Sequence, residues 1–273
     1  MPIISAGLWQ VKKAEALDMI PKALDVGFNH IDASCVVYQN ENELGDALSK
    51  FPRKSFFLTS KLDPFSFTAD NAFPMSSEQL AKCLASHQVS TLDLVLVHWS
   101  PGNCAVIQET WRAMETFYKA GKARAIGVSN FCPSHLKCLM ETATVPPSIN
   151  QVLYHVGVGP KHPLQDAMDK FGVKLQAYSP LGAGTTGNPR TPELISGDLV
   201  TSIGAKYGKS GAQVSLRWLV QQEVPLACES TSKAHLSADL DIFDFELDAN
   251  DMAALGAYQD GTAEAILGRC PKV

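Results

Sequence analysis

Short apolar runs alternate with amphipathic segments along the whole chain. Seven of these runs hold about four to eight mostly apolar residues, as is typical of parallel strands that are buried on both faces. They lie at 28–34, 56–62, 92–99, 123–131, 147–155, 173–180 and 224–230, and residues 5–9 give a candidate eighth strand. The pattern therefore predicts eight buried strands separated by helices.

The segments between the strands show helical periodicity. One face of a helix is indicated by apolar residues spaced at i, i+4, i+7 and i+11, namely Ile107, Trp111, Met114 and Tyr118. An earlier segment repeats the pattern with Leu17, Ile20 and Leu24. Three helical segments end at a glycine before the next strand, where a left-handed cap strains glycine least: Gly27, Gly121 and Gly172.

Eight strand and helix units in about 250 residues predict an α/β fold of one particular kind, the eight-stranded parallel (β/α)8 TIM barrel. Each parallel strand needs a helical crossover to return the chain to the same end of the sheet. No linker of Pro, Gly or Ser interrupts the pattern, so residues 1–273 are expected to form a single domain. The Gly- and Pro-rich segment 182–192 follows a strand, and we interpret it as a loop over the mouth of the barrel.

Composition excludes several classes of protein. Hydrophobic residues make up 45% and charged residues 19%, which favours a large core over disorder. The formal net charge is −5 and the basic residues are scattered, which argues against nucleic acid as a partner. No run approaches the ~20 apolar residues of a membrane span, and the first residues do not resemble a signal peptide, so we expect a soluble, unprocessed protein.

Cysteine usage bears on the compartment. The seven cysteines form an odd number and contain no CxxC pair, which we interpret as buried free thiols in a reducing, cytoplasmic environment. They are Cys35, Cys83, Cys104, Cys132, Cys138, Cys228 and Cys270. No cluster of His, Cys or carboxylate residues has metal-ligand spacing, so no metal is expected.

Residues 182–187, GAGTTG, match the G-x-G-x-x-G fingerprint of dinucleotide-binding Rossmann folds. That fingerprint must open a helix directly, so that the helix N-terminus meets the pyrophosphate. Here NPRTPE follows, and Pro189 and Pro192 oppose a helix start. The sequence favours a flap over a Rossmann turn.

Functional groups of a parallel barrel gather at the carboxyl ends of its strands. The polar residues that close the apolar runs, or lie just beyond one, are Asp32, Tyr38, Lys61, His98, Ser129, Asn130, Gln151, Tyr178 and Ser179. Taken singly, a buried His or Lys is more often structural than catalytic. Together they predict one polar rim.

Four of these residues predict a proton-donating device. A phenol with an ordinary pKa of about 10 is a poor acid near neutral pH, but an adjacent ammonium lowers that pKa. Lys61 would do this for Tyr38, and Asp32 would keep the buried Lys61 charged. His98, as a neutral imidazole, would hold a carbonyl oxygen toward Tyr38.

Several ordered motifs resemble those of the aldo-keto reductase superfamily over nearly the whole chain. They are HIDASCVVYQNE, LTSKL, LVHWS, GVSNF, INQVLYH, AYSPLG and FDFEL. The resemblance implies an eightfold barrel that binds a nicotinamide cofactor, NADH or NADPH, without a Rossmann domain and reduces aldehydes or ketones.

The resemblance also implies residue roles. Tyr38 would be the general acid, Lys61 and Asp32 would set its pKa, and His98 would orient the carbonyl group. Tyr178 would stack on the nicotinamide. The residues that would bind its carboxamide are Ser129, Asn130 and Gln151. The family's flap covers the pyrophosphate at the positions of Ser179, Leu181 and Gly182.

The chain departs from the family pattern near the expected pocket. Five residues, not four, separate Asp32 from Tyr38, so we place an irregularity before Tyr38. Asp63 stands near where relatives carry an aromatic residue, which indicates either a polar pocket suited to hydroxylated substrates or a solvated loop aspartate. The loop after His98 and the C-terminal tail are short, so an open pocket with Trp9 and Trp99 as apolar walls is expected.

The segment after the last strand bears on the choice of cofactor. NADPH-using relatives carry a Lys-Ser pair and then an Arg, but here Glu229 replaces the Lys and His235 replaces the Arg. A carboxylate 4 to 6 Å from a 2′-phosphate would disfavour binding by roughly 1 to 4 kcal/mol, so NADH is favoured. Against this, Lys233 lies nearby, and the hydroxyl groups of Ser230, Thr231 and Ser232 could bind a phosphate.

Two alternative functions remain open from the sequence. Lys61 could be the nucleophile of a Schiff-base aldolase, although pairing with Asp32 opposes this. The chain could instead be a non-catalytic, nicotinamide-binding regulatory member of the same fold. The expected substrate is a small aldehyde, keto acid or sugar-derived carbonyl, and a closed barrel without sheet edges favours a monomer.

Overall fold

Eight short parallel strands close into a barrel in the computed structural model, which describes residues 1–182 and 192–270. The strands are β1 (Ile4–Gly7), β2 (His30–Asp32), β3 (Phe57–Leu62), β4 (Leu94–Val97), β5 (Ile126–Ser129), β6 (Ile149–Leu153), β7 (Lys174–Tyr178) and β8 (Leu226–Cys228). Each strand pairs with the next, and β8 pairs with β1. The predicted TIM barrel and all eight predicted strands are confirmed, and the Rossmann alternative is excluded.

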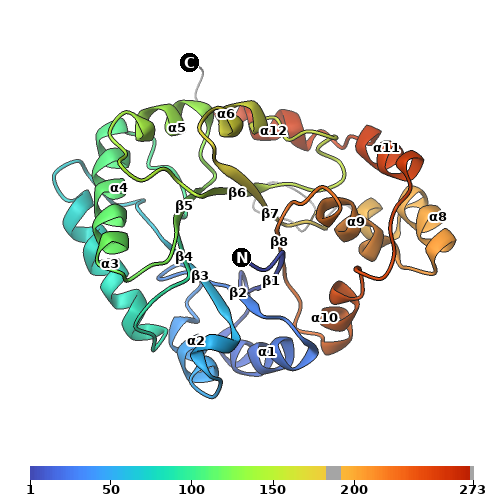
Figure 1. The fold of residues 1–273 in the computed structure, drawn as a ribbon, viewed down its shortest axis with the longest axis horizontal. Helices are drawn as coiled ribbons and strands as arrows, with labels where there is room; N and C mark the ends of the chain where they lie inside the picture. Colours follow the sequence, from blue (N-terminus) through green and yellow to red (C-terminus); the bar gives the residue numbers. More distant parts are fainter. Residues whose placement is uncertain (183–191, 271–273) are drawn as a thin grey trace.

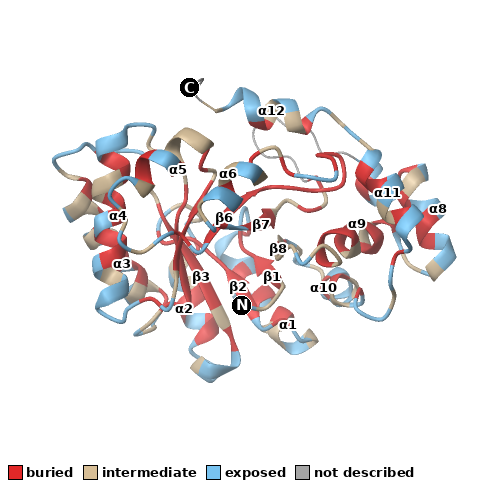
Figure 2. Ribbon diagram, turned by 45° about the horizontal axis from the view of Figure 1, so that its top comes forward, coloured by how far each residue is buried: buried red, intermediate tan, exposed pale blue. Residues whose placement is uncertain are grey.

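Helices surround the barrel (Figure 1). They are α1 (Lys13–Val26), α2 (Glu41–Leu48), α3 (Ala72–Ser86), α4 (Cys104–Lys119), α5 (Pro133–Met140), α6 (Gln165–Lys170), α7 (Glu193–Ser196), α8 (Asp198–Tyr207), α9 (Gly211–Val220), α10 (Lys233–Leu240), α11 (Ala249–Ala257) and α12 (Thr262–Gly268), with a 3-10 turn, η1, at Arg53–Ser55. Figure 2 shows the buried strands at the centre and exposed residues on the outer faces of the helices. None of the described helices has the length and apolar character needed to cross a membrane.

The helix faces agree with the sequence prediction only in part. In α4, Ile107, Trp111 and Met114 are buried, but Tyr118 at the end of the helix is 36% exposed. In α1 the buried face is formed by Ala16, Met19, Ile20 and Ala23, whereas Leu17 is 38% exposed. The predicted stripe was wrong for Leu17 because the neighbouring elements, and not the largest apolar side chains, decide which face packs inward.

Glycine ends several helices as predicted. Gly27, Gly121 and Gly172 adopt φ of +115°, +69° and +69°, the left-handed region that is strained for other residues. The predicted flap at 182–192, including most of GAGTTG, lies outside the described residues apart from its ends, Gly182 and Pro192.

The register of the strands places the interior side chains in layers. Asp32 pairs with Thr59 on β3, and Lys61 pairs with Leu96 on β4, so these four side chains share one face of the sheet. Leu94 and Leu96 pack with Ile149 in a small apolar cluster separate from the large core. Lys61, the only lysine among the buried residues of the described chain, is therefore paired in register with a member of this apolar cluster, Leu96.

Three disulfides correct the prediction of free thiols. They are Cys35–Cys83, Cys104–Cys138 and Cys132–Cys270, which leave Cys228 as a buried free thiol. The partners lie 48, 34 and 138 residues apart, so the pairing depends on the tertiary fold and has no local signal. The argument for a reducing, cytoplasmic environment therefore loses its basis.

The disulfides predict a thiol count. Under denaturing, non-reducing conditions a thiol reagent should titrate one group per chain, Cys228, and after reduction it should titrate all seven. Seven reactive thiols before reduction, in protein alkylated at lysis, would contradict the three pairings.

Candidate active site

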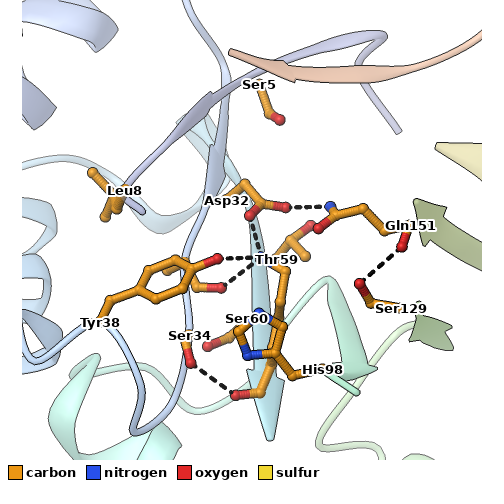
Figure 3. A network of polar contacts seen from close by, with 12 residues as sticks. Ser5, Leu8, Asp32, Ser34, Tyr38, Thr59, Ser60, His98, Ser129 and Gln151 are labelled. Carbon is orange, nitrogen blue, oxygen red and sulfur yellow. Dashed lines mark hydrogen bonds and ion pairs between the residues drawn. The ribbon is translucent and has the colours of Figure 1, made fainter. Parts of the chain in front are cut away.

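Asp32, labelled in Figure 3, forms an ion pair with Lys61 inside the barrel. Both side chains are almost fully buried, at 1% exposure for Lys61 and 4% for Asp32. Lys61 Nζ also donates to the carbonyl oxygen of Ala33 at 3.0 Å and to the Tyr38 hydroxyl at 3.2 Å. The ammonium therefore has three oxygen partners, which offset the loss of water around a buried charge.

The ion pair fixes the charge states of this site. Burial acts to lower the pKa of the Lys61 ammonium, but Asp32 and Tyr38 together raise it above its usual value. Burial raises the pKa of the Tyr38 phenol; Lys61 lowers it, as the sequence predicted, but burial, Asp32 and Glu229 outweigh Lys61. Tyr38 is therefore a neutral phenol that hydrogen-bonds to a cation, the form from which a proton can be donated.

The loop that carries Tyr38 absorbs the extra residue through bends at 35–39. Ser34 Oγ donates to the carbonyl oxygen of Lys61 at 3.3 Å and accepts from the Val37 N–H at 3.2 Å. At the end of the loop the buried Asn40 Nδ2 donates to the carbonyl oxygens of Leu8 and Val11. Because Cys35 is also tied to Cys83, the loop is fixed at several points on either side of Val36.

His98 faces Tyr38 from the end of β4. The two rings meet edge to face, with centroids 5.8 Å apart. Burial, followed by the charge of Lys61, lowers the pKa of His98 to about 3, so the imidazole is neutral at physiological pH, as the sequence predicted. Its buried Nδ1 has no hydrogen-bond partner among the described residues.

Polar side chains continue the rim across β5, β6 and β7. Ser129 Oγ donates to the carbonyl oxygen of Gln151 at 2.8 Å, and the Tyr178 hydroxyl donates to Asn130 Oδ1 at 2.9 Å. Asn130 holds a left-handed φ of +58° and donates through Nδ2 to the carbonyl oxygen of His98. Strained backbone of this kind collects at functional sites because the surrounding contacts hold it.

Gln151 also contacts the ion pair. Its Nε2 donates to Asp32 Oδ2 at 2.7 Å, a hydrogen bond drawn in Figure 3. The same Nε2 donates to Gln176 Oε1 at 3.1 Å. The sequence analysis missed Gln176, which is fully buried on β7. The expected contact of Gln151 with a nicotinamide carboxamide stays a prediction.

Aromatic side chains line the mouth of the site. Trp9 packs edge to face on Tyr38 at 5.2 Å, and Trp99 lies 6.0 Å from His98, so both lie beside the catalytic candidates. The sequence analysis missed Phe65, which stacks on Trp99 at 6.4 Å and is 68% exposed. An aromatic residue is thus present at the mouth near the position where Asp63 suggested a polar wall.

Asp63 itself is half-buried in a turn. Its Oδ1 accepts from the Phe65 N–H at 3.1 Å, and burial raises the pKa of its carboxyl group. This contact is typical of a loop aspartate, and the expected role of Asp63 in the pocket stays a prediction.

The remaining cofactor candidates follow β7 and β8 at the same end of the barrel, on the connections or in the first turn of α10. Ser179, Leu181 and Gly182 follow β7, where Ser179 and Gly182 both have positive φ. Glu229, Ser230, Thr231 and His235 follow β8, and Ser232 caps α10 by accepting from the His235 N–H. Hydroxyl, amide and aromatic groups at this rim fit a nicotinamide dinucleotide, whereas no group of three or more metal-ligating side chains exists among the described residues.

The closed parallel barrel holds a charged Lys61, a neutral Tyr38 and a neutral His98 together at its carboxyl rim. Comparison with known proteins names the class: the Aldo/keto reductase family model matches residues 4–260. The chain belongs to that family and is an oxidoreductase that acts on carbonyl groups.

Individual relatives agree over nearly the full length. A glyoxal reductase of Bacillus subtilis is 36% identical over 260 residues, which cover 94% of this chain and 88% of the relative. The crystal structure of MGS-M4, an aldo-keto reductase enzyme from a Medee basin deep-sea metagenome library, superimposes with a TM-score of 0.86 at 34% identity and covers 96% and 92% of the two chains. A Bombyx mori aldo-keto reductase in complex with NADP gives a TM-score of 0.80 at 28% identity, with 95% and 89% coverage.

The buried ion pair predicts a stability change. Asp32→Asn should lower the free energy of unfolding by about 3 to 5 kcal/mol, because it leaves the Lys61 charge uncompensated inside the barrel. Adding Lys61→Met should restore much of the loss, and Asp18→Asn, which breaks the exposed pair with Lys22, should change it by less than about 1 kcal/mol. Urea unfolding measures the free energy of unfolding of all three variants. Equal effects of Asp32→Asn and Asp18→Asn would contradict the account.

Proposed function

We propose that this protein reduces small aldehydes or ketones to alcohols with a nicotinamide cofactor, and that Tyr38 donates the proton. The observation that carries the proposal is the contact of the neutral Tyr38 phenol with the charged Lys61, deep in the barrel. A nicotinamide bound at this rim supplies the hydride.

Each residue of the site has its own role in the proposed reaction. The Tyr38 hydroxyl donates its proton to the carbonyl oxygen as negative charge develops there, and Lys61 stabilises the phenolate that remains. Neutral His98 donates a hydrogen bond to the same oxygen and fixes its direction. Asp32 does not contact the substrate; it keeps Lys61 charged throughout the cycle.

The same ion pair opposes the aldolase alternative. A Schiff-base lysine must lose its proton to attack a carbonyl group, whereas Asp32 and Tyr38 hold Lys61 as an ammonium. Because every position of the proton-donating set is filled, the non-catalytic alternative is also disfavoured.

The proposed substrate is a small polar carbonyl compound. The similarity to a glyoxal reductase supports a small aldehyde. The aromatic groups of Trp9, Phe65 and Trp99 would form the apolar part of the pocket.

We further propose that NADH is preferred over NADPH because Glu229 lies at the mouth of the barrel. It directly follows β8 and is exposed, and its charge acts to raise the pKa of the buried Tyr38. A carboxylate there repels the extra phosphate of NADPH.

Replacing the proton donor tests the reaction. Tyr38→Phe should lower kcat about a hundredfold to ten-thousandfold while the affinity for the cofactor stays unchanged. Tyr118→Phe, on the outer surface of α4, is the matched control and should leave both unchanged. A Tyr38→Phe enzyme with near-normal kcat across a panel of small aldehydes would remove Tyr38 from the mechanism.

Charge reversal tests the cofactor preference. Glu229→Lys should strengthen NADPH binding about tenfold or more relative to NADH, because attraction replaces repulsion of the 2′-phosphate. Quenching of tryptophan fluorescence during titration with each cofactor measures this ratio, and Glu246→Lys on an exposed loop serves as the control. If wild-type protein binds NADPH more tightly than NADH, the proposed preference is wrong.

A further inference from the structure

Gln176 makes a single side-chain hydrogen bond within the described residues. Its Oε1 accepts from Gln151 Nε2 at 3.1 Å, and the two residues are register partners on β7 and β6. Gln176 is fully buried, and its Nε2 has no hydrogen-bond partner among the described residues. A buried amide with unpaired N–H groups is unfavourable, and an apolar side chain of similar size would avoid this penalty. Packing of the core alone therefore does not require a glutamine at this position.

The Gln151 side chain reaches from β6 to Asp32 on β2, which lies on the opposite side of the closed barrel (Figure 3). Because an ionised carboxylate can only accept hydrogen bonds, the Gln151 amide has to present Nε2, and not Oε1, to Asp32. The second N–H of Nε2 meets Gln176 Oε1. Since an amide group is planar, these two contacts together fix the direction in which Gln151 Oε1 points.

A free acceptor distinguishes Gln151 from the other two residues expected to bind a nicotinamide carboxamide. Ser129 Oγ donates its proton to the carbonyl oxygen of Gln151. Asn130 Nδ2 donates to the carbonyl oxygen of His98 and to Ser129 Oγ, and Asn130 Oδ1 accepts from Tyr178. Gln151 Oε1 accepts from no donor of the described residues. Such an acceptor fits a ligand group that carries an N–H, as a nicotinamide carboxamide does.

We propose that Gln176 is a positioning residue for the cofactor, which holds the Gln151 amide so that Oε1 accepts from the carboxamide N–H of the nicotinamide. This inference rests on the proposed function and adds a residue to it. Gln176 does not contact the cofactor and acts through Gln151. Because the same Gln151 amide donates to Asp32, Gln176 also connects the nicotinamide site to the buried ion pair.

Two dinucleotides that differ in one group test the inference. They are NAD+ and 3-acetylpyridine adenine dinucleotide, in which a methyl ketone replaces the carboxamide. The methyl ketone keeps the carbonyl oxygen but has no N–H for Gln151 Oε1. Wild-type protein should bind NAD+ about threefold to tenfold more tightly, the effect of one net hydrogen bond. Isothermal titration calorimetry measures both dissociation constants without any substrate.

Three variants assign this preference to the pair of glutamines. Gln176→Met should reduce it to less than about twofold, because the Gln151 amide then keeps one fixed contact and can rotate about it. Gln151→Met should have the same effect, and adding Gln176→Met to it should change the ratio no further, since Gln176 acts through Gln151. Gln176→Glu should keep part of the preference, because burial beside Asp32 favours a protonated carboxyl group, which still offers an oxygen acceptor.

Gln213→Met is the matched control. Gln213 is also buried, but its Nε2 donates to the carbonyl oxygen of Asp241 and its Oε1 accepts from the Ser210 N–H, so both ends of its amide are paired. Its replacement should lower the free energy of unfolding, measured in urea, and leave the binding ratio unchanged. Gln176→Met should not lower the free energy of unfolding, because it removes unpaired N–H groups together with the hydrogen bond.

Two results would overturn the inference while leaving the reductase function intact. One is an unchanged binding ratio in Gln176→Met, which together with a lower free energy of unfolding would show a purely structural role. The other is equal binding of the two dinucleotides by wild-type protein. Binding of neither dinucleotide by wild-type protein would instead contradict the proposed function, and this inference with it.

Discussion

The buried ion pair of Lys61 with Asp32 is the interaction on which the rest of the site depends. An unpaired ammonium inside a protein is so unfavourable that it would lose its proton, and a neutral Lys61 could not stabilise a phenolate. Asp32 prevents this, and Gln151 in turn donates to the second oxygen of Asp32. The barrel makes the arrangement possible because neighbouring parallel strands place Asp32 and Lys61 on the same interior face. The chemistry thus follows from strand register, and the strand register follows from the closed sheet.

The loops at the carboxyl rim are held to the barrel by covalent links as well as by hydrogen bonds. Cys35–Cys83 ties the loop before Tyr38 to α3. This disulfide lies close to Ser60 and His87, whose side chains hydrogen-bond at 2.8 Å. Ser60 directly precedes Lys61 in the chain. Cys132–Cys270 ties the tail to the loop after β5. Both links fix segments that carry candidate site residues or the C-terminal tail, in a part of the fold where loops would otherwise be the most variable elements. Positioning of this kind supports catalysis because the donor is oriented before the substrate arrives.

The sequence predicted the strands and the catalytic candidates because buried parallel strands leave continuous apolar runs, and a polar residue that ends such a run is conspicuous. Asp32, Lys61 and His98 were found in this way, and Tyr38 from its place just beyond the second run. Features that depend on contacts between distant segments had no such signal. The disulfides, the Phe65 stack on Trp99, and the approach of Arg269 to Tyr178 all join residues from different loops. Leu17 was assigned to the buried face of its helix because periodicity gives the spacing of apolar residues but does not show which helix face packs against neighbouring elements.

The central claim is that the folded protein holds a neutral Tyr38 phenol against a charged Lys61. NMR of protein labelled at the tyrosine 13Cζ position tests this most directly, because that carbon shifts strongly when a phenol ionises, and Tyr38→Phe identifies its signal. Since burial raises the pKa of Tyr38, the signal should keep its phenol position up to at least about pH 9 in the protein without cofactor. A phenolate signal at neutral pH would show that the proton is not on Tyr38, and would contradict the account.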